Sequence, residues 1–368
     1  MKFICDKSSL IEAINTVQKA VSPKSTMPIL EGILLECNDN KVVLTGNDLE
    51  IGIRYEIEAS ISEPGSIVLN SRMFGDIIRK LPDSSVMIET DANNITNIKC
   101  VNVDFNISGL LSTEFPKINE VARDNYIQIE SNKLKKMIKQ TIFAVSIREN
   151  KPVLTGALFE IENSRFTMVA SDGYRLAIRN ETIKDTNNII NAIVPGKTLN
   201  ELLKIIKDDE SNITIYFADK HVLFEFDNFI VTSRLRDGEY IKYKSAIPTE
   251  YNIEINANVM DFCDSIDRAA LIINTETSKS PLKLDIKNDT IKISCSSHMG
   301  KVSDIINVDS SGGELIIGFN HKYLWDAFKN CEDEEVKLKF ISERYPLIIT
   351  PNKGEEFLYM ILPIIIQS

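Results

Sequence analysis

The chain has 368 residues, of which 43% are hydrophobic and 26% charged, and its formal net charge is −11. This composition is ordinary for a globular protein and excludes a disordered or low-complexity chain. The longest apolar stretch, residues 357–366, is about half of what a bilayer-spanning helix needs, and the N-terminus lacks the apolar run of a signal peptide. We therefore expect a cytoplasmic protein that makes no membrane contact.

The six cysteines are scattered along the chain, and none forms a CxxC pair. Without a secretory signal there is no reason to expect an oxidising compartment. The sequence therefore predicts buried thiols rather than a disulfide framework.

The first of three similar segments begins with a helical pattern over Ser8–Val21. A strand pattern over Pro28–Glu36 then leads through an Asn-Asp-Asn turn into a second strand pattern over Val42–Arg54. Apolar alternation that is interrupted by Asn and Asp turns is typical of antiparallel hairpins. A second helical pattern covers Ser71–Leu81.

A second copy of this segment follows about 124 residues later. Its helical patterns cover Asn132–Ser146 and Lys197–Lys207. Its strand patterns cover Pro152–Glu160 and Phe166–Asn180, and the latter run reads FTMVASDGYRLAIRN. The sequence therefore uses the same unit twice.

A third, fainter copy has helical patterns over Asn258–Ile272 and His321–Asn330. Between them, apolar and polar residues alternate from Pro281 and turn at Asn288-Asp289. At roughly 100–200 residues per domain, the chain length agrees with three domains. We predict an α+β protein of three duplicated domains, each with two helices and antiparallel sheets, spanning residues 1–122, 123–249 and 250–368.

Positive charge is concentrated on the six predicted helices. They contain fourteen Lys and Arg against seven Asp and Glu, so they carry +7 and leave −18 for the rest of the chain. In helix 132–146, apolar residues form one stripe, lysines occupy the opposite arc, and no acidic residue is present. Any one such helix would be read as a solvated face, but six together indicate a basic lining that attracts phosphates without reading sequence. Helix 258–272 departs from this pattern, because Asp261 and Asp264 share its outer arc with Arg268.

Three short segments resemble enzymatic or metal-binding motifs, but each lacks a residue that its motif requires. Pro195-Gly-Lys-Thr198 resembles the end of a phosphate-binding loop, but Asn191 stands where the motif needs glycine. Cys295 and His298 lack a second pair of metal ligands. Ser171 and Asp172 are strand neighbours that point to opposite faces, with no histidine nearby in the chain. We expect no catalysis, no metal and no cofactor.

The three copies, the ASDGYRLA run, the PVLTGALFE strand and the YMILP ending resemble the bacterial DNA polymerase III beta subunit, the sliding clamp, over residues 1–363. The resemblance implies a ring of two chains joined head to tail, with helices lining a central hole that encircles duplex DNA. It also implies a processivity factor that tethers the replicative polymerase and binds a clamp loader and other proteins carrying clamp-binding peptides.

The resemblance implies three sets of site residues. The dimer interface falls on Phe105 and Ile107, which face Leu271 and Ile272 of the other chain. The cations expected to face DNA are Lys24, Arg72, Arg79, Lys133, Lys136, Lys139, Arg148, Lys151, Lys197 and Lys204. The peptide-binding pocket falls on Leu154, Ser171, Gly173, Tyr174, Arg175, Leu176, Ile241, Asn320, Tyr323, Pro346, Met360, Leu362, Pro363 and Ile364.

The chemistry of the pocket set suits a peptide. Leu154, Leu176 and Met360 would form an apolar socket, and Arg175 and Asn320 would fix polar groups at its rim. Two positions depart from the family: Ile241 replaces the usual proline and Ile365 the usual arginine, which alters one side of the pocket. From the residues alone, the favoured interpretation is that Asp172-Gly173 is a plain turn and that residues 361–366 form a buried strand.

A second class of function stays open from the residues alone. A three-domain scaffold or small-ligand module that does not bind DNA would also use the duplicated hairpins. It would leave the clustered cations on the helices unexplained.

Overall fold

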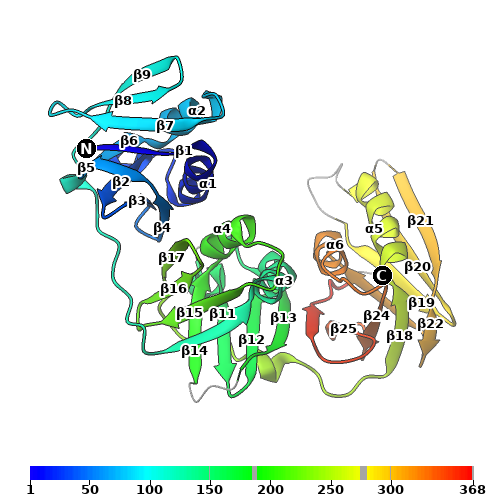
Figure 1. Ribbon diagram of the computed structural model, residues 1–368. Helices are drawn as coiled ribbons and strands as arrows, with labels where there is room; N and C mark the ends of the chain where they lie inside the picture. The colour runs from blue at the N-terminus through cyan, green and yellow to red at the C-terminus, as the bar shows by residue number, and fades with distance from the viewer. Residues whose placement is uncertain (149, 185–188, 274–279, 299, 367–368) are drawn as a thin grey trace. The chain divides into compact units, whose positions relative to one another are not determined.

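The computed structural model describes the whole chain except residues 149, 185–188, 274–279, 299, 367 and 368. The chain folds into two compact units, residues 1–132 with 201–235 and residues 133–200 with 236–368. Each unit combines antiparallel sheets with helices (Figure 1), as the sequence predicts.

The first unit contains two antiparallel sheets. The smaller has the strand order β5-β1-β7-β8-β9, with bounds Ser60–Glu63, Lys2–Asp6, Ser85–Thr90, Ile95–Cys100 and Val103–Ser108. The larger has the order β10-β15-β16-β17-β4-β3-β2-β6, with bounds Tyr126–Glu130, Asn212–Phe217, His221–Glu225, Phe229–Arg234, Ile51–Glu58, Lys41–Asn47, Gly32–Asn38 and Gly65–Asn70. Because β17 pairs with β4, strands from the first and second repeats share one sheet.

Helices α1 (Lys7–Val17) and α2 (Ser71–Lys80) of this unit pack against each other, and α1 covers β3 and β4. Each begins at a capping side chain, Asp6 for α1 and Asn70 for α2, which accepts hydrogen bonds from the free N–H groups of the first turn. The 3-10 helices of the unit are η1 (Gln18–Ala20), η2 (Pro28–Glu31) and η3 (Ser112–Glu114).

The second unit also contains two antiparallel sheets. The larger has the order β14-β11-β12-β13-β26-β25-β24-β18-β22, with bounds Ile190–Pro195, Gly156–Glu162, Arg165–Ser171, Arg175–Thr182, Phe357–Ile361, Leu347–Pro351, Glu335–Phe340, Ile253–Asn258 and Asp309–Ser311. The smaller has the order β21-β20-β19-β23, with bounds Gly300–Asn307, Thr290–Ser297, Leu282–Lys287 and Leu315–Phe319. Here β13 pairs with β26, so the second and third repeats share a sheet.

Helices α5 (Val259–Ile273) and α6 (His321–Lys329) pack against each other, and α5 covers β20 and β21 (Figure 1). The remaining helices are α3 (Ser131–Thr141), α4 (Gly196–Ile205), η4 (Ile142–Ala144), η5 (Pro152–Thr155) and η6 (Tyr243–Ala246). The six predicted helices are therefore confirmed to within a few residues at each end. In α3 the predicted apolar stripe is also confirmed, since Leu134, Met137 and Ile138 are fully buried.

One turn occurs in the first two repeats with the same hydrogen bonds. In the first repeat, Asp48 Oδ1 accepts from the N–H groups of Glu50 and Ile51 between β3 and β4. In the second, Asp172 Oδ1 accepts from the N–H groups of Tyr174 and Arg175 between β12 and β13. The predicted run Phe166–Asn180 is thus two strands joined by an Asx turn, because the Asp side chain replaces the strand ladder with local bonds.

Within the described residues, four of the six cysteines are buried and Cys263 and Cys331 are half-buried, all as free thiols. Burial raises the pKa of both Cys5 and Cys37 to about 12. The prediction of unpaired thiols is confirmed, while two of them are less buried than expected. No helix in the described parts of the chain is long and apolar enough to cross a membrane.

Candidate functional site

All fourteen residues of the predicted peptide pocket belong to the second unit. Leu154, Leu176 and Met360 come together in one buried hydrophobic cluster. Strand pairing explains how residues so far apart in sequence meet, because Leu176 on β13 lies opposite Met360 on β26. The predicted apolar socket therefore has a floor shared by the second and third repeats.

Sequence reasoning missed two aromatic members of this cluster, Tyr240 and Tyr243. Both come from the segment between β17 and β18. The hydroxyl of Tyr243 donates to Glu160 Oε2 at 2.7 Å, and burial together with this carboxylate raises the pKa of Tyr243. The only sequence signal for them is a pair of tyrosines three residues apart in a connecting segment. In the structure, the bond from Tyr243 to Glu160 anchors this segment on β11.

The turn at Gly173 forms one edge of the socket. Gly173 has a φ of +89°, a backbone conformation in which a residue with a side chain is strained. Its N–H donates to Ser171 Oγ at 3.1 Å. A Cβ added at Gly173 would meet nothing within 4 Å. The backbone conformation thus favours glycine, and the space beside it is open to a ligand.

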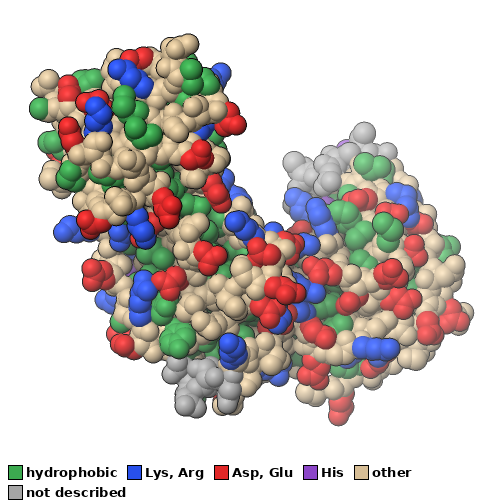
Figure 2. Space-filling model, in the orientation of Figure 1, with side chains coloured by type: hydrophobic (Ala, Val, Ile, Leu, Met, Phe, Trp, Pro, Cys, Tyr) green, Lys and Arg blue, Asp and Glu red, His purple; other side chains and the backbone are tan. Residues whose placement is uncertain are grey.

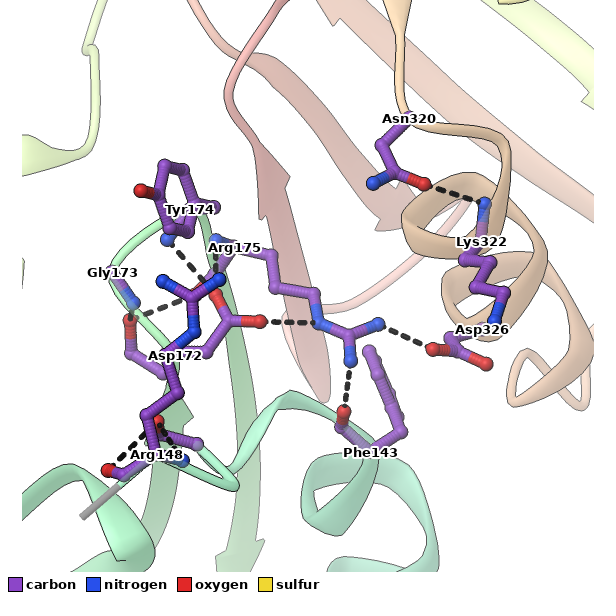
Figure 3. A network of polar contacts seen from close by, with 11 residues as sticks. Phe143, Arg148, Asp172, Gly173, Tyr174, Arg175, Asn320, Lys322 and Asp326 are labelled. Carbon is purple, nitrogen blue, oxygen red and sulfur yellow. Dashed lines mark hydrogen bonds and ion pairs between the residues drawn. The ribbon is translucent and has the colours of Figure 1, made fainter. Parts of the chain in front are cut away.

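The guanidinium of Arg175 is the centre of a polar network (Figure 3). Its Nε donates to Asp172 Oδ2 at 3.1 Å, and its Nη1 donates to Asp326 Oδ2 on α6. Its Nη2 donates to the backbone carbonyl of Phe143, and the group lies 4.5 Å from the centre of the Tyr323 ring. The side chain is only 11% exposed. The sequence predicted a polar donor at the rim, whereas the structure uses each nitrogen of Arg175 to hold the walls together.

Asn320 has a similar internal role. Its side-chain oxygen accepts from the N–H of Lys322 and so caps the first turn of α6 (Figure 3). Tyr323, one turn further on, stacks against Tyr174 with ring centres 6.5 Å apart. Tyr174 is 52% exposed, so its ring offers a free apolar face beside the socket.

The C-terminal tail is bonded to the Gly173 turn and to β23. The N–H of Leu362 donates to the Tyr174 carbonyl at 3.0 Å, and the N–H of Ile364 donates to the Gly318 carbonyl at 2.7 Å. Leu362 is 39% and Ile364 38% exposed. Ile241, at the position of the family's proline, is 39% exposed. Pro346, just before β25, and Pro363 in the tail are both half-buried.

None of the cations predicted to face DNA is buried: Lys133 and Lys136 are half-buried and the other eight are exposed. Several are paired within the chain. Lys136 and Lys139 contact Glu332 at 2.7 and 3.6 Å. Burial acts to raise the pKa of Glu332, but the two lysines lower it below its usual value. On the visible surface, basic side chains are interspersed with acidic ones (Figure 2).

Further pairs involve α2 and α4. Asp76 contacts Arg79 at 2.8 Å and Arg72 at 4.0 Å. Lys204 contacts Glu201 at 2.7 Å. The remaining predicted cations, none of which lies in a strand, are Lys24, Lys133, Arg148, Lys151 and Lys197.

The predicted dimer contacts differ in exposure. Phe105 is 38% exposed on β9, an edge strand, while Ile107 is 8% exposed and belongs to the core. Phe105 also lines a groove of about 390 Å³ with residues of α2, including Arg72. Leu271 is 75% exposed at the end of α5, and Ile272 beside it is half-buried. Phe105 and Leu271 therefore offer the free apolar surface.

No group of three or more His, Cys, Asp and Glu side chains suited to a metal ion occurs among the residues the structure describes. Cys295 is buried, and its thiol donates to the Ala269 carbonyl at 3.7 Å. Ser171 Oγ donates to the Arg175 carbonyl at 2.7 Å and so serves the turn.

Comparison with known proteins covers nearly the full length of the chain. Family profiles of the DNA polymerase III beta subunit match residues 1–119 as its N-terminal domain, 128–242 as its central domain and 244–365 as its C-terminal domain. The beta sliding clamp of Staphylococcus epidermidis is 38% identical over 374 residues, which cover 99% of each chain.

Several solved structures are similar over 100% of both chains. Two of them are a DNA polymerase sliding clamp from Bacillus subtilis, at 36% identity and a TM-score of 0.96, and a putative DNA polymerase III beta subunit from Eubacterium rectale, at 38% identity and a TM-score of 0.96. The chain belongs to the DNA polymerase III beta subunit family, the beta sliding clamps, which are non-catalytic processivity factors of the polymerase.

Proposed function

We propose that two copies of the chain close head to tail into a ring around duplex DNA. The observation that carries this proposal is a joint that occurs twice within the chain. The strand after the first Asx turn, β4, pairs with β17, the last strand of the second repeat. The strand after the second Asx turn, β13, pairs with β26, the last strand of the third repeat.

The third joint is left open in a single chain. Its two strands are β21, which holds the place of β4 and β13 in the third repeat, and β9, the last strand of the first repeat. Both are edge strands among the described residues, and edges with free N–H and C=O groups are templates for pairing. Pairing β21 of one chain with β9 of another would join two chains at both ends, which is closure with two-fold symmetry.

Exposed side chains support the same joint. Phe105 lies on β9, and Leu271 lies in the last turn of α5, the helix that covers β21. Three domains per chain, with boundaries near residues 122 and 249, would give a ring of six domains. Its helices would carry the +7 charge toward the DNA phosphates, which requires no sequence reading.

The ring is tested by the mass in solution. Sedimentation velocity of the wild-type protein should give about twice the 41.5 kDa chain mass. Phe105→Asp should give a monomer, because a desolvated carboxylate opposes closure. Leu110→Asp is the matched control, since Leu110 is 48% exposed in the same unit but lies outside β9. A wild-type monomer, or a Phe105→Asp dimer, would contradict the proposed joint.

The DNA contact is tested separately on α3. Lysine-to-glutamate changes at Lys133, Lys136 and Lys139 should shorten the products of a loader-dependent polymerase assay, and the loss should deepen with salt. Lys353→Glu is the control, since Lys353 is exposed and lies outside the helices, the peptide socket and the predicted set of cations. Unchanged product length in the triple variant would remove α3 from the DNA surface.

The apolar socket around Leu154, Leu176 and Met360 is proposed to bind clamp-binding peptides of the replicative polymerase, the clamp loader and other replication and repair proteins. The open space at Gly173 and the exposed ring of Tyr174 support this use. The socket would tether a polymerase by keeping it at high effective concentration near DNA. This activity takes place in the cytoplasm, where the bacterial chromosome is replicated.

A further inference from the structure

Beside the tail, the smaller sheet of the second unit carries a basic groove on the side away from α5. It has a volume of about 730 Å³, and its lining includes Lys283, Lys292, Lys301 and the tail residues 364–366. These three lysines come from three neighbouring strands, β19, β20 and β21.

The strand register fixes the face that the lysines occupy. Leu282 and Leu284 on β19 and Ile291 and Ile293 on β20 are at most 1% exposed, and α5 packs on β20. Because side chains alternate along a strand, Lys283 and Lys292 must point to the opposite face. Ser294 on β20 lies opposite Lys283 on β19, so a small hydroxyl group lies beside the lysines.

The three lysines of the groove outnumber the acidic residue that shares their face. Asp285 lies opposite Lys292 across β19 and β20, and its carboxylate contacts Lys287 at 3.7 Å. Asp304 on β21 bonds Arg268 of α5, on the opposite face. No described carboxylate pairs with Lys283, Lys292 or Lys301. This patch of three cations lies on a chain whose net charge is −11.

The tail forms an apolar wall to the same groove. It runs close along β23, since a Cβ added to Gly318 would lie 2.9 Å from Cγ1 of Ile366 and 3.0 Å from the carbonyl oxygen of Ile364. This packing leaves Ile365 80% exposed and Ile364 38% exposed. The groove therefore has a cationic floor and an aliphatic side.

We propose that this groove binds an extended acidic segment of a partner protein in which acidic and aliphatic residues alternate. An extended chain presents successive residues on opposite sides, so carboxylates can meet the lysines while aliphatic side chains meet Ile364 and Ile365. A nucleic acid fits less well, because single strands are held on aromatic platforms and no aromatic side chain is among the described lining residues.

This surface is distinct from the proposed peptide pocket, with which it shares only Ile364. In the proposed ring it also stays accessible, because pairing at the edge of β21 uses backbone groups and leaves the outward side chains uncovered. Loss of the groove would therefore leave ring closure and the peptide socket in place.

The test uses the full-length protein and a fluorescein-labelled peptide that alternates glutamate with leucine, followed by fluorescence anisotropy. The triple variant Lys283→Gln, Lys292→Gln and Lys301→Gln should weaken binding about tenfold, as the loss of three exposed ion pairs predicts. Lys287→Gln is the matched control, since this lysine shares the face but already contacts Asp285, and it should leave the affinity within about twofold.

Two comparison probes separate the alternatives. A peptide that alternates glutamine with leucine should bind at least about tenfold more weakly than the glutamate peptide, since its charge is absent. Labelled duplex DNA should bind the triple variant as it binds the wild type. The proposal is overturned if the glutamate peptide does not bind, if the triple variant binds it unchanged, or if the triple variant loses DNA binding instead.

Discussion

The Arg175 network makes a quantitative prediction about how the second unit is held together. Asp326→Ala removes one of the two carboxylates around a guanidinium that is only 11% exposed. A hydrogen bond to a charged group contributes about 1.5–3 kcal/mol, and breaking a buried pair costs about 3–5 kcal/mol. Since the Asp326 side chain is 35% exposed, solvent screens part of this, and we expect a loss of about 1.5 kcal/mol in the free energy of unfolding.

The single tryptophan provides the assay. Trp325 precedes Asp326 on α6, so its fluorescence during a urea titration reports unfolding of the helix that Arg175 holds. Arg175→Lys should cost more, about 2–3 kcal/mol, because an ammonium cannot bond Asp172, Asp326 and the Phe143 carbonyl in a planar fork. In a double-mutant cycle the two changes should be strongly non-additive.

A matched control fixes the scale. Glu343→Gln removes an exposed carboxylate whose nearest cation is the neighbouring Arg344 at 3.8 Å, and it should change stability by less than about 0.5 kcal/mol. If Asp326→Ala and Arg175→Lys both change the free energy of unfolding as little as this control does, Arg175 is not a structural anchor. The prediction that it is a polar donor to a ligand at the rim would then be favoured.

Three other predictions follow from local structure. Leu49 has a φ of +75° in the first Asx turn, so Leu49→Gly should raise the free energy of unfolding by about 1 kcal/mol, and Gly173→Ala in the second turn should lower it by about as much. Calorimetry on both variants tests this, and a stability change of the same sign in both would contradict it. The hydrogen bond from Arg268 lowers the pKa of Asp304 below its ordinary 3.8, so the bond stabilises the fold above that pH and the contribution is lost as pH falls through the lower folded-state pKa. Asp304→Asn should reduce the loss of melting temperature that the wild type shows as pH falls below about 4. A pH dependence equal to that of the wild type would refute the role of this bond. Because burial raises the pKa of Cys5 and Cys37 to about 12, a thiol reagent at mild alkaline pH should modify them only after denaturation, and rapid modification of the native protein would contradict their burial.

The helices could be predicted from sequence because their signals are local. An apolar stripe and a capping side chain, such as Asp6 before α1, fall within a few residues of each other. The duplicated hairpins were predictable for the same reason. The joints β4–β17 and β13–β26 were not, because pairing between strands so distant in sequence leaves no local pattern.

The candidate site was predictable in part. The family positions correctly brought Leu154, Leu176 and Met360 into one cluster. They could not show that Arg175 donates a hydrogen bond to Asp326, since the two residues are 151 positions apart in the sequence. In the sequence, each looks like an ordinary surface charge. The sequence does not predict burial of Tyr240, because an aromatic residue in a connecting loop is expected to be exposed, whereas this one is 9% exposed.

The repeated joint also predicts where the proposed ring would open. The joints β4–β17 and β13–β26 link parts of one chain, so their strands stay at high effective concentration if they separate. The proposed joint between β9 and β21 has no such tether, and its formation must offset about 4–15 kcal/mol of lost translational and rotational freedom. With similar strand pairing at every joint, the contact between chains would be the weakest, and a protein that opened the proposed ring would need to act only there. Phe105 and Leu271 are therefore the positions where single substitutions should change ring lifetime most.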